Sequence, residues 1–90
     1  MAVAVHICPT KMSRDEYERI IKDLEDSGVS EPKGRSFHAA YGDDRVCMFE
    51  IWDSAEQFDA HRDQLFATLQ GAGLDAGTVE IHPLHSRHPD

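Results

Sequence analysis

Histidine is the residue type in this sequence best suited to acid–base chemistry, and the 90 residues include six of them. A neutral imidazole near pH 7 can accept or donate a proton, which is what enolisation or proton-assisted oxygenation requires. His38 lies in a predicted strand and His61 on the inner side of a predicted helix, so these two are the candidate catalytic residues. The alternative for each is a half-buried packing residue with one hydrogen-bond partner.

His6 could join the same cavity if its side chain leaves its strand on the matching side. Three imidazoles in one place would favour a site like those that hold zinc or non-haem iron. Their spacing is non-local and forms no short ligand motif, so we expect no metal and no cofactor. His82, His85 and His88 follow at the end of the chain, where we expect solvated side chains.

Cys8 and Cys47 are the two cysteines, and their spacing is not that of a CxxC motif. The N-terminus has no basic segment and only a short apolar run, so it predicts a strand and not a signal peptide. We therefore expect a cytoplasmic protein in which both cysteines are free thiols, buried as small strand residues. The alternative is a redox pair or a nucleophile.

The charge balance excludes some classes of partner. Nine Lys and Arg against 17 Asp and Glu give a net charge of −8. Neutralising phosphates needs a basic patch, so we expect neither nucleic acid nor an anionic membrane surface as a partner. No apolar run approaches the ~18 residues of a membrane span. We expect one domain over residues 1–90, small enough to gain from an interface with a second subunit.

Four segments have the alternating apolar pattern of strands: residues 2–8, 35–41, 45–52 and 77–84. A turn at 42–44 makes the middle two a hairpin. If Tyr41 faces Val46, the register assigns the two faces. One face then carries Phe37, Ala39, Tyr41, Val46, Met48, Glu50 and Trp52, and the other carries His38, Ala40, Cys47, Phe49 and Ile51.

Both of these faces are largely apolar, so both must be covered. We expect the two helices to cover one face and a second copy of the chain to cover the other, across Trp52. Glu50 is unusual on an apolar face. It would pair with Arg35 or Arg45, lie near an edge, or meet a group of the partner.

Two helices follow from capping signals and apolar stripes. Ser13 and Glu16 form a capping box, and Gly28 ends the first helix. Asp53 or Ser54 caps the second, whose inner stripe consists of Phe58, His61 or Arg62, Leu65 and Leu69. The order of elements predicts a ferredoxin-like α+β fold, βαββαβ, with a four-stranded antiparallel sheet and both helices on one face. Two such sheets packed face to face make a dimeric α/β barrel.

The run EIWDSAEQFDAH, from Glu50 to His61, resembles the signature of the dimeric α/β-barrel superfamily, in its antibiotic-biosynthesis monooxygenase (ABM)-like branch. Together with GRSFHAA at 34–40 and PLH at 83–85, it resembles small actinobacterial members of unassigned function. The resemblance implies a homodimer through the sheet face. It also implies a ligand pocket between the sheet and the helices of each subunit.

The side chains expected around that pocket are His38 and His61 as catalytic residues, and His6, Phe49, Ile51, Phe58 and Leu65 as substrate-binding residues. The resemblance implies a cofactor-independent monooxygenase or isomerase acting on a small aromatic or polyketide-like compound. The alternatives are a non-catalytic ligand-binding or accessory protein on the same scaffold, and a purely structural dimer. Fold alone does not decide between them.

Overall fold

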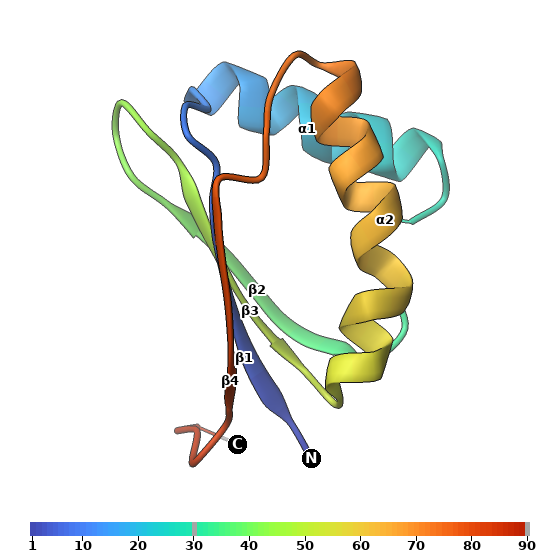
Figure 1. The fold of residues 1–90 in the computed structure, drawn as a ribbon, viewed down its shortest axis with the longest axis vertical. Helices are drawn as coiled ribbons and strands as arrows, with labels where there is room; N and C mark the ends of the chain where they lie inside the picture. The colour runs from blue at the N-terminus through green and yellow to red at the C-terminus, as the bar shows by residue number, and fades with distance from the viewer. Residues whose placement is uncertain (30, 90) are drawn as a thin grey trace.

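The computed structural model describes residues 1–29 and 31–89, so Ser30 of the predicted loop and Asp90 of the tail lie outside the described residues. The elements are β1 (Val3–Cys8), α1 (Arg14–Asp26), β2 (Arg35–Tyr41), β3 (Cys47–Trp52), α2 (Ala55–Gly71) and β4 (Thr78–Pro83). The strands form one antiparallel sheet in the order β2-β3-β1-β4, and both helices lie on the same side of it (Figure 1). The predicted ferredoxin-like α+β fold is confirmed.

Both helices begin at the serines that the sequence marks. In α1, Glu16 N donates to Ser13 Oγ at 3.1 Å and Ser13 N donates to Glu16 Oε1 at 2.9 Å, the predicted capping box. Ser54, not Asp53, caps α2, because its Oγ accepts from Gln57 N at 3.2 Å. No helix among the described residues is long and apolar enough to cross a membrane.

The core lies between the two helices and one face of the sheet. Alternate residues of β1 and β3 point into it, as the period of a strand requires. Burying these side chains is the main stabilising contribution to the fold. The buried apolar residues that the strands and helices contribute to this core are Val3, Val5, Ile7, Met48, Trp52, Ile20, Leu24, Phe58, Leu65 and Leu69.

The register of the β2–β3 hairpin differs by one residue from the prediction. Tyr41 pairs with Cys47 and not with Val46. Val46 leaves the ladder because its N–H donates to the Met12 carbonyl at 2.8 Å and its side chain is buried in the core. The connection between the strands therefore spans residues 42–46 and is longer than the predicted turn.

This shift changes which residues share a face of the sheet. Trp52 is 0% exposed and packs against Phe58 of α2, with ring centroids 5.6 Å apart. The prediction that Trp52 faces a second copy of the chain is therefore wrong. His38, Ala40, Met48, Glu50 and Trp52 lie on the helix-covered face. Phe37, Ala39, Tyr41, Cys47, Phe49 and Ile51 lie on the other side, which we call the open face.

Cys8 and Cys47 form a disulfide, so the prediction of two free thiols is wrong. Cys8 ends β1 and Cys47 begins β3, next to the Ile7–Met48 pair of the ladder. The sheet therefore holds their Cα atoms 4.4 Å apart, although 39 positions separate them in sequence. That separation lies at the short end of the range that a disulfide spans. Only the strand pairing reveals this proximity.

Candidate functional site

Glu50 is the centre of a polar cluster buried between the sheet and the helices. Glu50 is 2% exposed. Trp52 Nε1 donates to Oε1 at 2.9 Å, and His38 Nδ1 donates to Oε2 at 2.7 Å. Arg35 Nη1 also donates to Oε2, at 3.2 Å. A carboxylate without water needs such donors to keep its charge. The expected pairing of Glu50 with Arg35 is one of the alternatives from the sequence, and it is confirmed.

An irregularity in β2 places Arg35 and His38 on the same side of the sheet. In a regular strand, residues an odd number apart point to opposite faces. The register shifts between Arg35 and Phe37, as a β-bulge does, and this brings the Arg35 side chain round to Glu50. The sheet therefore presents a guanidinium and an imidazole to the same carboxylate.

His38 joins Glu50 to helix α1. Its Nε2 lies 2.8 Å from the Tyr17 hydroxyl, while its Nδ1 faces Glu50. An ionised carboxylate only accepts hydrogen bonds, so the proton of the neutral ring resides on Nδ1. Nε2 then has the lone pair and Tyr17 donates to it. Tyr17, His38 and Glu50 thus form a continuous path for a proton from α1 through β2 to β3.

The charges of this path follow from its surroundings. Burial raises the pKa of Glu50, but the hydrogen bonds from His38 and Trp52 and the charge of Arg35 outweigh it and leave the pKa lowered. Burial also raises the pKa of the Tyr17 hydroxyl. At neutral pH, Glu50 is therefore ionised and Tyr17 retains its proton.

His61 approaches the cluster from α2. It is 7% exposed and its ring centroid lies 5.5 Å from that of Trp52. Burial lowers the pKa of His61, and the charge of Glu50 opposes this only in part, so the ring is neutral at pH 7. His61 also lines a pocket of about 240 Å³ with Gln57 and Gln64 of the same helix.

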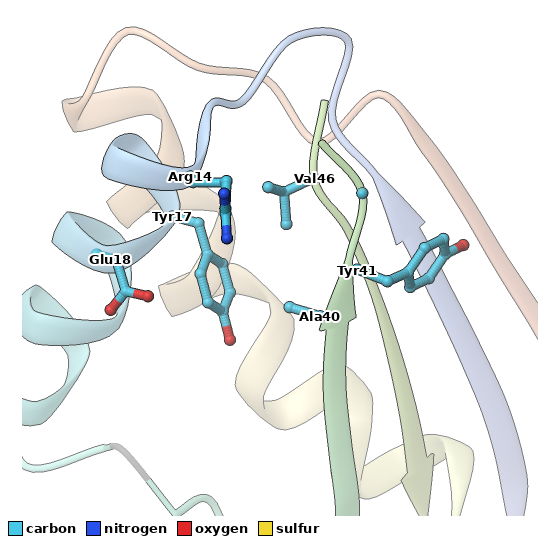
Figure 2. A pocket seen from close by; sticks show the side chains of 7 residues that line it. Arg14, Tyr17, Glu18, Ala40, Tyr41 and Val46 are labelled. Atoms are coloured by element: carbon cyan, nitrogen blue, oxygen red, sulfur yellow. The ribbon is translucent and has the colours of Figure 1, made fainter. Parts of the chain in front are cut away.

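The path opens to the surface at two places. Tyr17 lines a pocket of about 190 Å³ between α1 and the β2–β3 hairpin, together with Arg14 and Glu18 (Figure 2). His38 and Arg35 line a second pocket, of about 410 Å³, beside the loop before β2. A small molecule would therefore meet the hydrogen-bonded path at Tyr17 in the first pocket and at His38 in the second.

The structure brings some of the predicted site residues together. His38 contacts Glu50, and His61 contacts Trp52, which itself donates to Glu50. Phe58 and Leu65 lie on the same side of the sheet as part of the core, 0% and 3% exposed.

Three other predicted site residues lie apart from this cluster. His6, Phe49 and Ile51 are on the open face, where His6 pairs with Phe49 across β1 and β3. The suggestion that His6 enters the cavity of His38 and His61 is wrong, because the parity of β1 turns Val5 and Ile7 into the core. A three-histidine metal site is therefore not formed.

Tyr17 is the site residue that the sequence interpretation missed. In the sequence it is one member of an apolar stripe of α1 at helical spacing, formed with Ile20, Ile21 and Leu24. The feature of the sequence that could have identified Tyr17 is its hydroxyl, because a half-buried tyrosine on an otherwise aliphatic stripe usually forms a hydrogen bond. In residues 1–29 and 31–89, the grouping of side chains able to hold a metal lies on the open face and not in this cluster. The cluster is suited to moving protons.

Comparison with known proteins identifies the fold. No family model matches the chain, and no curated protein matches its sequence. Solved structures match over nearly its full length. A mutant of SnoaB, a cofactor-independent oxygenase from Streptomyces nogalater, aligns at a TM-score of 0.67 with 10% identity, over 99% of this chain and 97% of that one. The chain has the fold of ABM-like proteins.

Two further ABM-like structures agree. A proposed antibiotic biosynthesis monooxygenase from Chloroflexus aurantiacus aligns at a TM-score of 0.63 with 15% identity, over 97% of each chain. Another from Deinococcus radiodurans aligns at 0.64 with 9% identity, over 97% of this chain and 95% of that one. The predicted resemblance to the ABM-like superfamily is confirmed at the level of fold, whereas the narrower resemblance to small actinobacterial proteins stays a prediction. At these identities the likeness carries no residue roles.

Proposed function

We propose that this ABM-like chain is an enzyme that removes a proton from a carbon acid of a small aromatic or polyketide-like compound, without a cofactor. The observation that carries the proposal is the Tyr17–His38–Glu50 path, with its ionised carboxylate and its two openings. An imidazole backed by a carboxylate is a general base of suitable strength near neutral pH.

In the proposed reaction, His38 Nε2 is the base. A substrate in the pocket beside Arg35 displaces the Tyr17 hydroxyl and gives its C–H proton to Nε2. Glu50 stabilises the imidazolium through Nδ1–H, and Arg35 attracts the enolate oxygen. His61, neutral and packed on Trp52, is a second candidate for proton transfer from the α2 side.

Two outcomes are open to the resulting enolate. Return of the proton to a different carbon gives an isomer. In a monooxygenation, the enolate carbon adds to O2 and gives it two electrons, and protonation yields a hydroperoxide. Elimination of water from that hydroperoxide removes two more electrons from the carbon and leaves C=O. Overall, CH2 gives four electrons to O2, one oxygen atom enters the product and the other leaves as water. The electrons come from the substrate itself, and this is why no cofactor is needed.

The test uses an anthrone, a tricyclic aromatic ketone with an acidic ring CH2. Under anaerobic conditions, the protein is expected to accelerate exchange of that CH2 with deuterated water, and in air to consume one O2 per anthrone oxidised. His38→Asn is expected to lower the exchange rate by about 10²–10⁴-fold, the range for losing a general base. His82→Asn, on an exposed histidine of β4, is the matched control.

For each proposed residue role, one experimental result would contradict it. Full exchange in His38→Asn would contradict the role of His38, and full turnover in His61→Ala would remove His61 from the site. Tight binding of the anthrone with neither exchange nor O2 consumption would favour the alternative, a non-catalytic ligand-binding protein on the same scaffold.

We further propose a homodimer through the open face. Phe37 and Tyr41 are 42% and 51% exposed there, beside the half-buried Phe49, and such an apolar surface on a small domain favours burial against a second copy. Light scattering at micromolar concentration is expected to give twice the chain mass, and Phe37→Asp a single mass. A monomer mass for the unmodified protein would contradict the dimer.

We also propose that this protein is located in the cytoplasm. A disulfide in a reducing compartment is in exchange with cellular thiols, so Cys8 and Cys47 are expected to be partly reduced in cells. Fractionation, combined with alkylation of free thiols at lysis, tests both points. Fully oxidised protein outside the cytoplasm would contradict them.

A further inference from the structure

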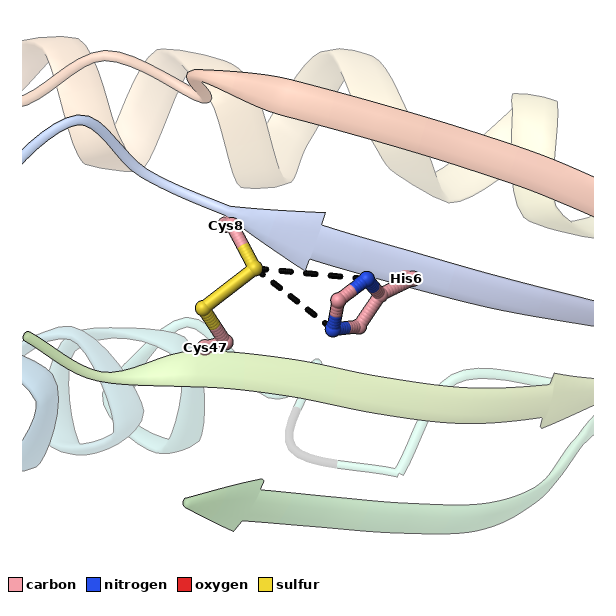
Figure 3. A group of neighbouring side chains, drawn as sticks. All are labelled: His6, Cys8 and Cys47. Atoms are coloured by element: carbon pink, nitrogen blue, oxygen red, sulfur yellow. Dashed lines mark hydrogen bonds between the residues drawn. A yellow bond between two sulfur atoms is a disulfide. The ribbon is translucent and has the colours of Figure 1, made fainter. Parts of the chain in front are cut away.

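A second group of reactive side chains lies on the open face, away from the proposed catalytic site. Cys8 and Cys47 stand opposite each other at the ends of β1 and β3 that adjoin the β2–β3 connection. His6 lies on the same face, two residues before Cys8 (Figure 3). The ring nitrogens Nε2 and Nδ1 of His6 lie 3.5 and 4.0 Å from Cys8 Sγ. The three potential ligand atoms are all within 4.8 Å of one another.

Two sulfurs and one imidazole nitrogen form a donor set that selects thiophilic metals. Zn²⁺ is held by two cysteines and one histidine in some catalytic sites, with a water molecule in the fourth position. All three side chains here are half-buried, so an ion could enter from the open face. Glu80 stands opposite His6 on β4, on the same face, and its carboxylate adds a favourable negative charge.

The backbone holds the cluster in place independently of the disulfide. Regular ladder pairs, His6 with Phe49 and Ile7 with Met48, fix β1 against β3 just beside the cysteines. The end of β1 is held further by Arg45, whose Nη2 donates to the Cys8 carbonyl at 3.2 Å. Reduction of the disulfide would therefore leave both sulfurs beside His6, because their positions are set by the sheet.

We propose that the reduced protein binds one Zn²⁺ through Cys8, Cys47 and His6, and that the disulfide is the metal-free oxidised form of the same site. Reduction by a dithiol gives the protein two electrons and two protons, breaks the S–S bond and converts the dithiol to its own disulfide. Binding then replaces the two thiol protons by the metal, since the thiolate is the ligand. Exchange with a small-molecule disulfide reverses the change: that disulfide takes up two electrons, and two protons from water, to become two thiols, while the Cys8–Cys47 bond forms again and Zn²⁺ is released.

This site is separate from the proposed function. It lies on the opposite side of the sheet from His38 and Glu50, so His38→Asn should leave the zinc affinity unchanged. It adjoins the surface of the proposed homodimer, because the Tyr41 hydroxyl is hydrogen-bonded to His6 Nε2, whereas Phe37 and Ile51 pair at the other end of the β2–β3 hairpin. The histidine spacing in the sequence predicts no metal site, whereas the pairing of β1 with β3 brings two sulfurs beside one histidine.

The first experiment compares two redox forms of the unmodified chain. Protein reduced with a phosphine, and freed of it under argon, is titrated with Zn²⁺ against a chromophoric chelator. One Zn²⁺ per chain is expected for the reduced form, with both thiols unreactive until EDTA is added. The oxidised form is expected to bind at least ~100-fold more weakly, because the sulfurs are no longer thiolates. Substitution with Co²⁺ should give sulfur-to-cobalt charge-transfer absorption.

The second experiment uses variants whose folding is checked by circular dichroism. Cys8→Ser and Cys47→Ser should each abolish the charge-transfer band or weaken it strongly, and His6→Ala should weaken binding by at least ~10-fold. His82→Ala, another histidine on this face, is the matched control and should bind as the unmodified chain does. The proposal is overturned by a reduced chain that takes up no zinc, by equal binding in both redox forms, or by unchanged affinity in His6→Ala.

Discussion

The two faces of the sheet are built from alternate residues of the same strands, yet their polar and reactive side chains are held by different kinds of interaction. On the helix-covered face, Glu50 is surrounded by donors from Arg35, His38 and Trp52. On the open face, His6 lies beside the Cys8–Cys47 disulfide. The first is a network of non-covalent contacts buried between the sheet and the helices, whereas the second is a covalent link at a surface.

The difference between the two faces shows that polar side chains need hydrogen-bond partners from the protein where they are buried, and not where solvent reaches them. Within the part of the chain that the structure describes, no buried side-chain nitrogen or oxygen lacks a hydrogen-bond partner. A charge left unpaired under the helices is not solvated in place of its lost partner. Removing one member of the network therefore lowers the free energy of unfolding strongly. On the open face, solvent or a second subunit can take over the contact.

The largest expected effect is at Trp52. Trp52→Ala should lower the free energy of unfolding by about 4 kcal/mol, because it leaves a cavity beside Phe58 and removes a donor to Glu50. Phe37→Ala, on the open face, should cost no more than about 1 kcal/mol in the monomer. Urea unfolding at low protein concentration measures both. Equal losses would mean that the open face is also part of a packed core.

A slightly smaller effect is expected at Glu50. Glu50→Gln should cost about 3 kcal/mol, since Arg35 and His38 lose a buried charged partner. Glu80→Gln is the matched change on the open face, where the side chain is 53% exposed, and should cost about 0–1 kcal/mol. If both variants unfold at the same urea concentration, Glu50 is not paired in solution as described.

The disulfide should contribute about 2–4 kcal/mol. It closes a loop across a sequence separation of 39, which restricts the unfolded chain. Adding a phosphine reductant in the presence of EDTA should therefore lower the urea midpoint, and the double variant Cys8→Ser, Cys47→Ser should not respond to the reductant. A midpoint insensitive to reductant in the unmodified chain would show that the bond is absent in solution.

The smallest expected effect is on the pH dependence of stability. His61 has a lowered pKa in the folded chain, so below its ordinary value of 6.5 the unfolded chain binds more protons. Stability should fall as pH decreases from about 6.5, by at most about 1.4 kcal/mol per pH unit for one group. Glu50, whose folded pKa is also lowered, should add a loss below its ordinary value of 4.5.

The assignment of this pH profile to His61 is tested with one variant on each face of the sheet. His61→Gln should remove the fall that starts near pH 6.5, whereas His82→Gln, on the open face, should leave it in place. Thermal unfolding followed from pH 8 to pH 4 gives both results. A fall that persists unchanged in His61→Gln would assign it to another group.

The sequence predicted the elements well because their signals are local. The hydroxyl of Ser13 and the carboxyl of Glu16 are three residues apart, and a capping box needs nothing beyond that segment. The alternation in residues 2–8 likewise predicted β1. The pairing of Glu50 with Arg35 was among the alternatives because a buried carboxylate requires a cation or donors.

The set of β2 residues that shares a face with Trp52 could not be predicted in the same way. Both faces of the hairpin are apolar, so hydrophobicity does not choose between two registers that differ by one residue. The choice was made by Val46, whose N–H bonds to the Met12 carbonyl and whose side chain enters the core. Those contacts join segments that are distant in sequence.

The sequence by itself therefore determined the order of strands and helices, their caps, and which residues alternate within each strand. The tertiary structure decided which alternate set faces the helices. That decision placed His38 with Tyr17 and Glu50 in one buried path, and His6 with Cys8 and Cys47 on the opposite side. The physical reason is that a strand fixes the spacing of its own side chains, whereas only packing against other segments fixes its register.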